Sequence, residues 1–160
     1  MTVADLLDRA KAQGVMIATA ESCTGGMVAA ALTHIPGSSA VVDRGFVTYT
    51  NDAKQQMLGV NAETLETHGA VSEEVALEMA EGALKNSQAQ LTVSITGIAG
   101  PGGSEFKPEG RVCFGLAADG QKTKTETVEF GALGRDKVRI AARDHALNLL
   151  SHGISLFAQK

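Results

Sequence analysis

Apolar side chains recur along the chain with two spacings, one typical of helices and the other of strands. Residues 2–13 repeat apolar side chains at helical spacing and stop at Gly14, a common residue at a helix C-terminus. The composition of the run 91–96 predicts another strand, buried on both faces. The same criteria predict further strands at 15–20 and 41–50, and helices from the Gly25-Gly26 pair to 34, from an Asn51 or Asp52 cap to Gly59, on to about 68, and onward from a Ser72 cap.

The C-terminal part predicts a hairpin followed by a long helix. Segments 111–118 and 122–130 flank the turn sequence Asp119-Gly120. The second segment alternates strongly and carries charge, which is typical of a protected edge strand. An amphipathic helix then extends from Gly134 to about Phe157, with Gly153 as a candidate break.

Helices alternate with strands before the final hairpin, which predicts an α/β fold. We expect a three-layer α/β/α sandwich around a mixed, mainly parallel sheet of about five strands. The sequence has no internal repeat and no linker composition, so residues 1–160 are expected to form a single domain, long enough to bury a core.

Composition narrows the possible partners. The chain has 18 glycines but only five Phe, one Tyr and no Trp, so the core must be mainly aliphatic. So few rings cannot build a base-stacking surface, and a net charge of −4 provides no basic footprint for nucleic acid. We therefore expect no nucleic-acid partner.

No segment suggests a membrane or a metal. The longest apolar run without glycine, 27–32, is far shorter than the ~20 residues of a membrane helix. Asp5 stands where a signal peptide would carry a basic residue, so we expect a cytoplasmic protein. Cys23 and Cys113 form no CxxC motif and are expected to be reduced, and the histidines show no metal-ligand spacing.

Unusual residues follow the first predicted strand, where ligands commonly bind in open α/β sheets. Glu21-Ser22-Cys23-Thr24 leads into Gly25-Gly26, so Ser22 lies near a helix N-terminus that suits a nucleophile, an oxyanion hole or a phosphate cradle. Glu21 is the one carboxylate placed suggestively. A simple helix cap is the alternative, but two glycines at a helix start cost about 1 kcal/mol each relative to alanine, which favours a function.

A second junction combines the only tyrosine with a lysine. Tyr49 ends a predicted strand and Lys54 follows five residues later in the next helix, so both can point into one pocket. A lysine held there with little water would have a lowered pKa and could act as a general base. A surface lysine beside a half-buried tyrosine is the alternative.

A third junction, 96–104, begins with Thr96 and opens a loop in which five of the 18 glycines lie between Gly97 and Gly110. Neither a Walker loop nor a dinucleotide fingerprint fits, because no GK[ST] follows and Glu105 occupies the place of the third glycine. The loop is either a flexible crossover or a close backbone approach to a ligand.

Three arginines share one face of the last helix. Arg135, Arg139 and Arg143 recur at intervals of four residues. A solvated face is one explanation. The other is that one of them faces an anionic ligand, with the central Arg139 as the candidate.

The segments ESCTGG, YTNDAK, GAVS, SITGIAGPGG and KPEGRV, in this order, resemble the CinA C-terminal domain family of PncC-type nicotinamide-nucleotide amidases. The resemblance extends from about Leu6 to Leu150. It implies hydrolysis of nicotinamide mononucleotide to nicotinate mononucleotide and ammonia, in pyridine nucleotide salvage. It also implies a serine nucleophile, a lysine base, and no metal or other cofactor.

Residue by residue, the resemblance assigns the nucleophile to Ser22, the base to Lys54 and a catalytic tyrosine to Tyr49. Neutral Lys54 would deprotonate Ser22 and then protonate the departing ammonia, while Tyr49 orients the lysine or relays the proton. Backbone N–H groups of residues 24–26 would form the oxyanion hole, and the phosphate would bind Arg139 or the glycine loop. The candidate substrate-binding residues are Thr24, Gly25, Gly26, Thr96, Gly97 and Arg139.

Two alternatives stay open at this point. Cys23 could be the nucleophile with a histidine partner, because a helix start lowers a thiol pKa. The chain could also be a nucleotide-binding module without turnover, connected with competence or damage response. In each case the expected ligand is a small pyridine nucleotide, and we expect a homodimer or larger homo-oligomer.

Overall fold

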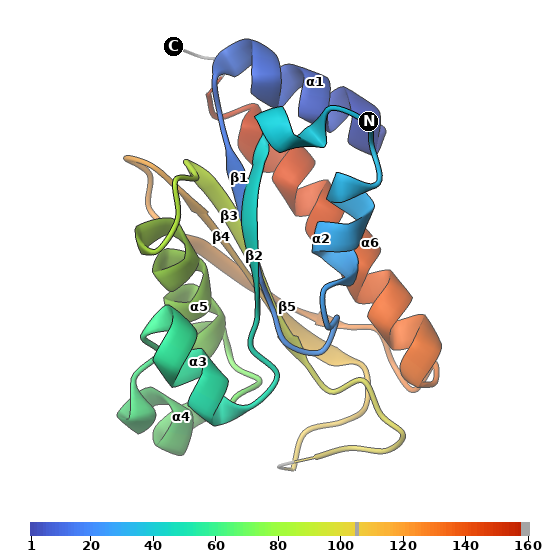
Figure 1. Ribbon diagram of the computed structural model, residues 1–160. Coiled ribbons are helices and arrows are strands. Elements are labelled where there is room, and N and C mark those ends of the chain that lie inside the picture. The colour runs from blue at the N-terminus through green and yellow to red at the C-terminus, as the bar shows by residue number, and fades with distance from the viewer. Residues whose placement is uncertain (105, 158–160) are drawn as a thin grey trace.

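The computed structural model describes residues 1–104 and 106–157, which form a five-stranded sheet between two layers of helices (Figure 1). The strands lie in the order β2-β1-β3-β4-β5. Their bounds are β1 Ile17–Glu21, β2 Val42–Val47, β3 Leu91–Gly97, β4 Arg111–Ala118 and β5 Lys124–Glu129. The helices are α1 Val3–Gln13, α2 Met27–Thr33, α3 Asn51–Leu58, α4 Ala62–His68, α5 Glu73–Lys85 and α6 Arg135–Ile154, with a 3-10 turn at Ser38–Ala40.

The sheet is mixed, as predicted. β1 pairs in parallel with β2 and β3, whereas β4 is antiparallel to both of its neighbours. Four of the five strands therefore run in one direction and only β4 is reversed. β5 is an edge strand, as its charge pattern predicts.

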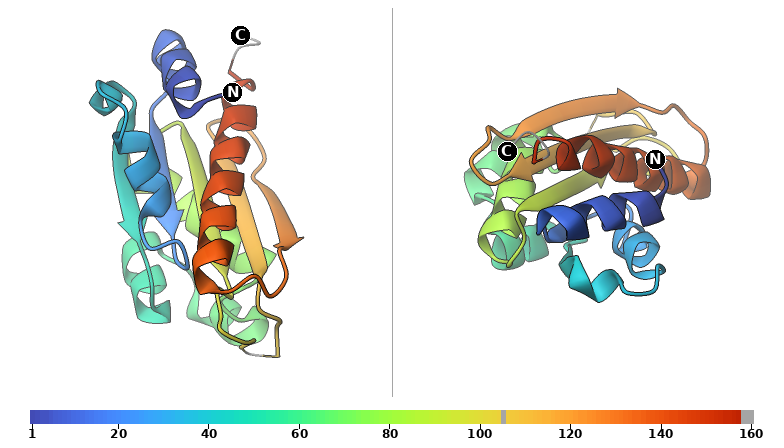
Figure 2. Two further views of the ribbon diagram at one scale, coloured as in Figure 1. Left: turned by 90° about the vertical axis from the view of Figure 1, so that its right-hand side faces the viewer. Right: turned by 90° about the horizontal axis from the view of Figure 1, so that it is seen from above.

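Helices cover both faces of the sheet. α3, α4 and α5 lie on one face, and α1, α2 and α6 on the other (Figures 1 and 2). Leu6, Leu32 and Leu150 belong to the core on the α6 side, and Val75 and Met79 to the core on the α5 side. Phe114 is fully buried among these aliphatic residues, so the prediction of a mainly aliphatic core is confirmed.

Helix ends follow the predicted capping chemistry with two corrections. Ser72 accepts from the Val75 N–H, and Gly14 ends α1 with φ +68°. The cap of α3 is Thr50 rather than Asn51 or Asp52, because the Thr50 hydroxyl already accepts from the Ala53 N–H at 3.1 Å. Gly153 does not break α6, since its bare α-carbon lets the helix pack closely against Leu91.

None of the helices in the described ranges is long and apolar enough to cross a membrane. Strand bounds are narrower than predicted, since β1 begins at Ile17 and β2 ends at Val47. Hydrogen bonding to β1 continues one residue beyond β2, because the Thr48 N–H donates to Glu21 O at 2.8 Å. This extension brings the end of β2 beside the start of the Ser22 turn.

Candidate active site

The three predicted junctions meet at one end of the sheet, where β1, β2 and β3 reach their carboxyl ends. β1, β2 and β3 are adjacent and parallel, with Glu21 in register with both Val47 and Ile95, so the segments that follow them converge. A cavity of about 240 Å³ opens at this end. The polar side chains that line it are Ser22, Tyr49, Asn51, Lys54, Thr96, Ser104 and Arg135.

Ser22 and Lys54 are in contact on the inner side of this cavity. Lys54 Nζ lies 3.0 Å from Ser22 Oγ and donates to the Thr48 carbonyl oxygen at 3.1 Å. Lys54 is 1% exposed and Ser22 is 8% exposed. The surface-lysine alternative is therefore wrong. Burial of an amine disfavours its charged form, and a neutral amine beside a hydroxyl can act as its base.

The fold explains why this lysine points inward. The Thr50 cap starts α3 immediately after β2, and the Lys54 N–H donates to Thr50 O in its first turn. Lys54 thus falls on the helix face that packs against the sheet edge. The Thr48 carbonyl was not singled out by sequence reasoning, because a backbone acceptor leaves no signature in residue types.

The turn between β1 and α2 is built on a buried carboxylate. Glu21 accepts from Thr24 Oγ1 at 2.6 Å and from the Val28 and Ala29 N–H groups at 2.9 and 3.0 Å. Gly26, the N-cap residue of α2, provides no side-chain cap, so Glu21 performs that function from the end of the strand.

The predicted substrate contacts in this turn are not brought to the cavity. Thr24 is fully buried and is used by Glu21, while Gly25 and Gly26 adopt φ +59° and +102°. A Cβ atom on Gly25 would lie 3.0 Å from the Arg139 guanidinium. None of these three residues is among the described residues that line the cavity. Their side chain or backbone conformation instead maintains the turn.

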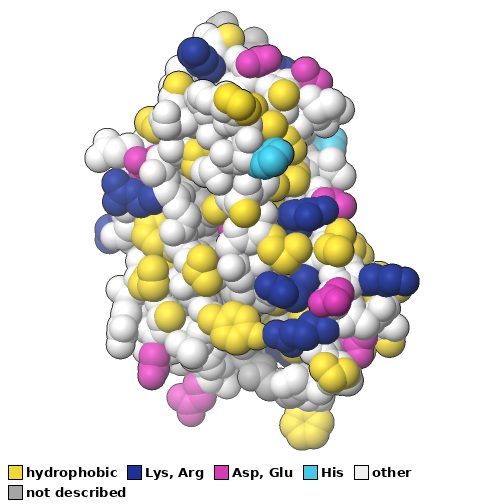
Figure 3. Space-filling model, turned by 45° about the vertical axis from the view of Figure 1, so that its right-hand side comes forward, with side chains coloured by type: hydrophobic (Ala, Val, Ile, Leu, Met, Phe, Trp, Pro, Cys, Tyr) yellow, Lys and Arg dark blue, Asp and Glu magenta, His cyan; other side chains and the backbone are white. Residues whose placement is uncertain are grey.

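The arginine at the cavity is Arg135, not Arg139. Arg139 lies behind the turn and donates to Cys23 O at 3.0 Å and Thr24 O at 3.4 Å. Arg135 donates to the Tyr49 hydroxyl at 2.6 Å and to Gly100 O at 2.7 Å. The sequence spacing alone could not separate them, because both lie on one helix face. Figure 3 shows Lys and Arg side chains in a row on this face.

Tyr49 lies at the mouth of the cavity, because it is 58% exposed and its hydroxyl is bound by Arg135. Its predicted catalytic contribution as a lysine partner or proton relay stays a prediction. Thr96 and Gly97 do line the cavity, as predicted. The Thr96 hydroxyl, however, donates to Ala70 O at 2.8 Å and thereby holds the opposite wall in place.

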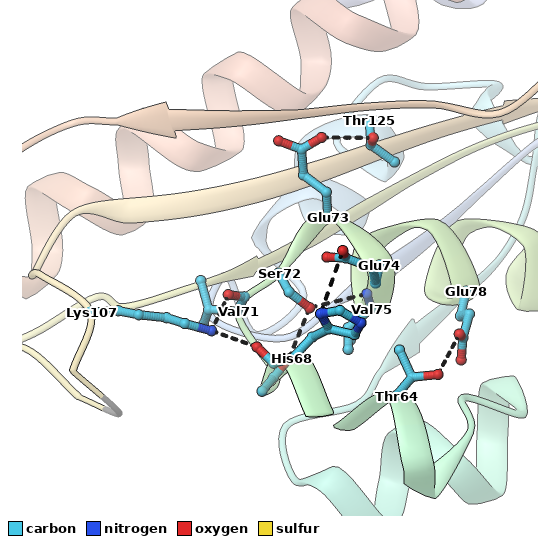
Figure 4. A network of polar contacts seen from close by, with 11 residues as sticks. Thr64, His68, Val71, Ser72, Glu73, Glu74, Val75, Glu78, Lys107 and Thr125 are labelled. Carbon is cyan, nitrogen blue, oxygen red and sulfur yellow. Dashed lines mark hydrogen bonds and ion pairs between the residues drawn. The ribbon is translucent and has the colours of Figure 1, made fainter. Parts of the chain in front are cut away.

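Two residues of the KPEGRV segment fasten the glycine loop, and sequence reasoning assigned them no role. Lys107 donates to His68 O at 2.8 Å and Val71 O at 2.6 Å, which ties the loop to the start of α5 (Figure 4). Glu109 accepts from the Gly102 and Gly134 N–H groups, which ties the loop to the start of α6. Their place in the KPEGRV segment was the signal in the sequence that could have identified them.

Cys23 is not prepared to act as a nucleophile. Burial raises the pKa of its thiol to about 12, against an ordinary value of 9.0, although a helix start was expected to lower it. Desolvation outweighs a backbone hydrogen bond and the nearby Arg139 guanidinium, both of which lower the pKa of this thiol. No histidine occurs among the described residues that line the cavity, so the expected partner is missing as well.

Neither this cavity nor the rest of the described chain brings together three or more His, Cys, Asp or Glu side chains that could hold a metal ion. The chemistry available at the site is that of a hydroxyl nucleophile, a buried amine and a cation at the rim. Such a set suits acyl transfer.

Comparison with known proteins gives consistent matches. A sequence model of the CinA C-terminal domain matches residues 2–154. The Escherichia coli K12 protein named nicotinamide-nucleotide amidohydrolase PncC is 55% identical over 141 residues, which cover 88% of this chain and 85% of that protein. A CinA-like protein of Chlorobium phaeobacteroides is 58% identical over 125 residues, which cover 76% of this chain but only 30% of that longer protein.

A solved structure supports the same assignment. The competence/damage inducible protein CihA from Agrobacterium tumefaciens superposes with a TM-score of 0.87 at 50% identity, covering 96% of this chain and 95% of that one. The described architecture is therefore shared along nearly the full length of a protein of known structure.

Proposed function

The chain belongs to the CinA C-terminal domain family, and from this premise we propose that it hydrolyses the carboxamide of nicotinamide mononucleotide to nicotinate mononucleotide and ammonia. Ser22 is the proposed nucleophile and Lys54 the proposed base. The observation that carries the proposal is the 3.0 Å contact between Lys54 Nζ and Ser22 Oγ at a buried position of the cavity.

The first half of the reaction forms an acyl-enzyme. Ser22 Oγ attacks the carboxamide carbon while its proton passes to Lys54 Nζ, which gives a tetrahedral intermediate with a negatively charged oxygen. When the intermediate collapses, the carbon–nitrogen bond breaks and Lys54 returns the proton to the departing nitrogen, so that ammonia leaves. The lysine is neutral again at the end of this half.

The second half hydrolyses the ester. Water attacks the acyl carbon as its proton passes to Lys54, the bond to Ser22 Oγ breaks, and the proton returns to the serine oxygen. Nicotinate mononucleotide is released and the starting enzyme is regenerated. The hydrogen bond that Lys54 Nζ donates to the Thr48 carbonyl oxygen holds the amine at the serine through both halves of the reaction.

Arg135 is the proposed contact for the phosphate. Its guanidinium lies at the rim of the cavity next to the Tyr49 hydroxyl, whereas the Arg139 guanidinium is bound to the carbonyl groups of Cys23 and Thr24. A planar guanidinium binds phosphate through paired hydrogen bonds. We therefore transfer the phosphate-binding role that the sequence assigned to Arg139 to Arg135.

The test is direct incubation of the purified protein with nicotinamide mononucleotide. The proposal predicts release of ammonia and of nicotinate mononucleotide in equal amounts, measured by a coupled ammonia assay and by mass spectrometry. Binding of the nucleotide without product would instead identify a non-catalytic module and refute the proposed activity. Retention of activity after exhaustive chelation would agree with the expected absence of a metal.

A further inference from the structure

Glu21 is a buried charged side chain placed at the start of the nucleophile turn, which we define as Ser22–Gly26. It is the last residue of β1 and is 0% exposed. Burial of a carboxylate is costly unless hydrogen bonds replace the lost water. The groups that supply those hydrogen bonds therefore indicate what this side chain does.

Both oxygens of the Glu21 carboxylate are engaged by the turn and by the helix that follows it. Oε1 accepts from Thr24 Oγ1 at 2.6 Å and from the Val28 N–H at 2.9 Å, and Oε2 accepts from the Ala29 N–H at 3.0 Å. Three donors aimed at both oxygens match an ionised carboxylate, which is an acceptor only. The short contact with Thr24 is typical of a charge-assisted hydrogen bond.

These contacts close the nucleophile turn at both ends. Glu21 directly precedes the turn, and Val28 and Ala29, which donate to its side chain, follow the turn in α2. Gly25 and Gly26 provide the left-handed backbone that the reversal needs, but they provide no side chain that could hold it. The geometry of the turn therefore depends on Glu21.

The outer side of the nucleophile turn is held separately. The Ser22 N–H donates to Ile95 O at 2.9 Å, and Arg139 donates to the carbonyl groups of Cys23 and Thr24. An anion inside the turn and a cation outside it thus restrain a backbone whose first side chain is Ser22. A small shift of this backbone would move Ser22 Oγ away from Lys54 Nζ.

We propose that Glu21 is a positioning residue for the nucleophile: its carboxylate fixes the nucleophile turn so that Ser22 Oγ stays in line with Lys54 Nζ. The inference rests on the proposed amidase function. Glu21 itself does not line the cavity and transfers no proton.

The test is Glu21→Gln, which keeps the shape but turns one acceptor into a donor facing a donor. We expect kcat for nicotinamide mononucleotide to fall about 10- to 100-fold while KM stays within about threefold, because positioning affects the reacting state more than binding. A simple loss of stability would lower the fraction of folded enzyme without changing kcat per folded molecule.

A second readout does not depend on the substrate. A fluorophosphonate labels an activated serine: the bond from Ser22 Oγ to phosphorus forms, fluoride leaves, and the hydroxyl proton passes to Lys54. Labelling of Ser22 in Glu21→Gln, followed by mass spectrometry, should slow by a factor similar to that of kcat. If the wild-type protein does not deamidate the nucleotide, the proposed function fails, but the labelling rate still tests the positioning role.

Glu78→Gln is the matched control. Glu78 performs the same local task elsewhere, since its carboxylate accepts from the Asn61 N–H at 2.8 Å and from the Thr64 hydroxyl at 2.7 Å, at the start of α4 (Figure 4). It does not line the cavity. This variant should lose stability but keep its kcat and its labelling rate.

The inference is overturned if folded Glu21→Gln labels and turns over at the wild-type rates. If Glu21→Gln does not fold, Thr24→Val decides, because it removes one donor to the carboxylate and preserves the side-chain shape. We expect a drop of about tenfold in kcat and in the labelling rate for this variant. Wild-type rates in folded Thr24→Val would then refute the positioning role.

Discussion

Lys54 and Ser22, the proposed base and nucleophile, are both buried. Lys54 has the Ser22 hydroxyl and the Thr48 carbonyl oxygen as partners at 3.0 and 3.1 Å, which together hold its amine beside Ser22. The sequence could place both residues at strand ends, but it could not show that they touch. Contact depends on the register of β1 with β2, which side-chain pattern alone does not set.

Replacing Arg135 with Met tests the proposed phosphate contact. Arg135→Met should raise KM for nicotinamide mononucleotide about 10- to 100-fold with little change in kcat, because it removes the proposed phosphate contact at the rim of the cavity. It should leave KM for the unphosphorylated nucleoside unchanged. Steady-state kinetics with both substrates measures this, and an equal rise for the two would contradict the phosphate assignment.

The Cys23 thiol predicts a pH dependence of stability. Burial raises its pKa from 9.0 to about 12, so the folded state keeps the thiol neutral while the unfolded chain ionises above pH 9. Stability from this group is therefore intact below pH 9 and is lost as pH rises from 9 towards 12, by up to about 1.4 kcal/mol per pH unit.

Cys23→Ser should remove this component. Denaturant unfolding of wild type and variant between pH 8 and 10.5 measures the difference, and the free energy of unfolding should fall more steeply with pH in the wild type. Equal slopes would show that the thiol ionises as easily in the folded protein as in the unfolded chain.

Among the elements, α3 carries Lys54, the proposed base, and the docking of α3 depends on a glycine of α5. A Cβ atom on Gly82 would lie 2.0 Å from the Leu58 carbonyl oxygen, so the two helices approach at this point with no room for a side chain. Leu58 is the last residue of α3, the helix that contains Lys54. A shift of α3 would therefore move Lys54.

Gly82→Ala should destabilise the protein by about 1–3 kcal/mol, although alanine favours helix by about 1 kcal/mol, because backbone must move to accept the methyl group. It should also lower kcat. Gly153→Ala in α6 is the control, because its nearest obstacle is the end of the Leu91 side chain. Thermal unfolding and kinetics of both variants measure this, and equal behaviour of the two would refute the special role of Gly82.

Most elements were predictable because their signals are local. Gly14, Ser72 and the charged edge strand each act through their own neighbours, and the structure confirms them. The α3 cap was missed by one residue because threonine and asparagine are both good caps. The continuity of α6 through Gly153 was missed because it depends on a packing contact with β3.

At the scale of the whole molecule, parallel pairing of β1, β2 and β3 gathers the three junctions into one cavity. Fold class could be predicted from the alternation of elements. Two features could not be predicted: which arginine reaches the cavity, and which groups Glu21 and the KPEGRV segment hold. Both depend on contacts between separate segments of the chain. The predicted homo-oligomer stays a prediction, which light scattering can test.

Ser22 is proposed as the nucleophile of an amide hydrolysis. The most direct test is the rate at which Ser22→Ala releases ammonia from nicotinamide mononucleotide, with Cys23→Ser measured beside it. We predict that Ser22→Ala folds normally and loses about 10³-fold or more in kcat, while Cys23→Ser remains active. Ammonia release by folded Ser22→Ala at a rate within about tenfold of the wild type would show that Ser22 is not the nucleophile.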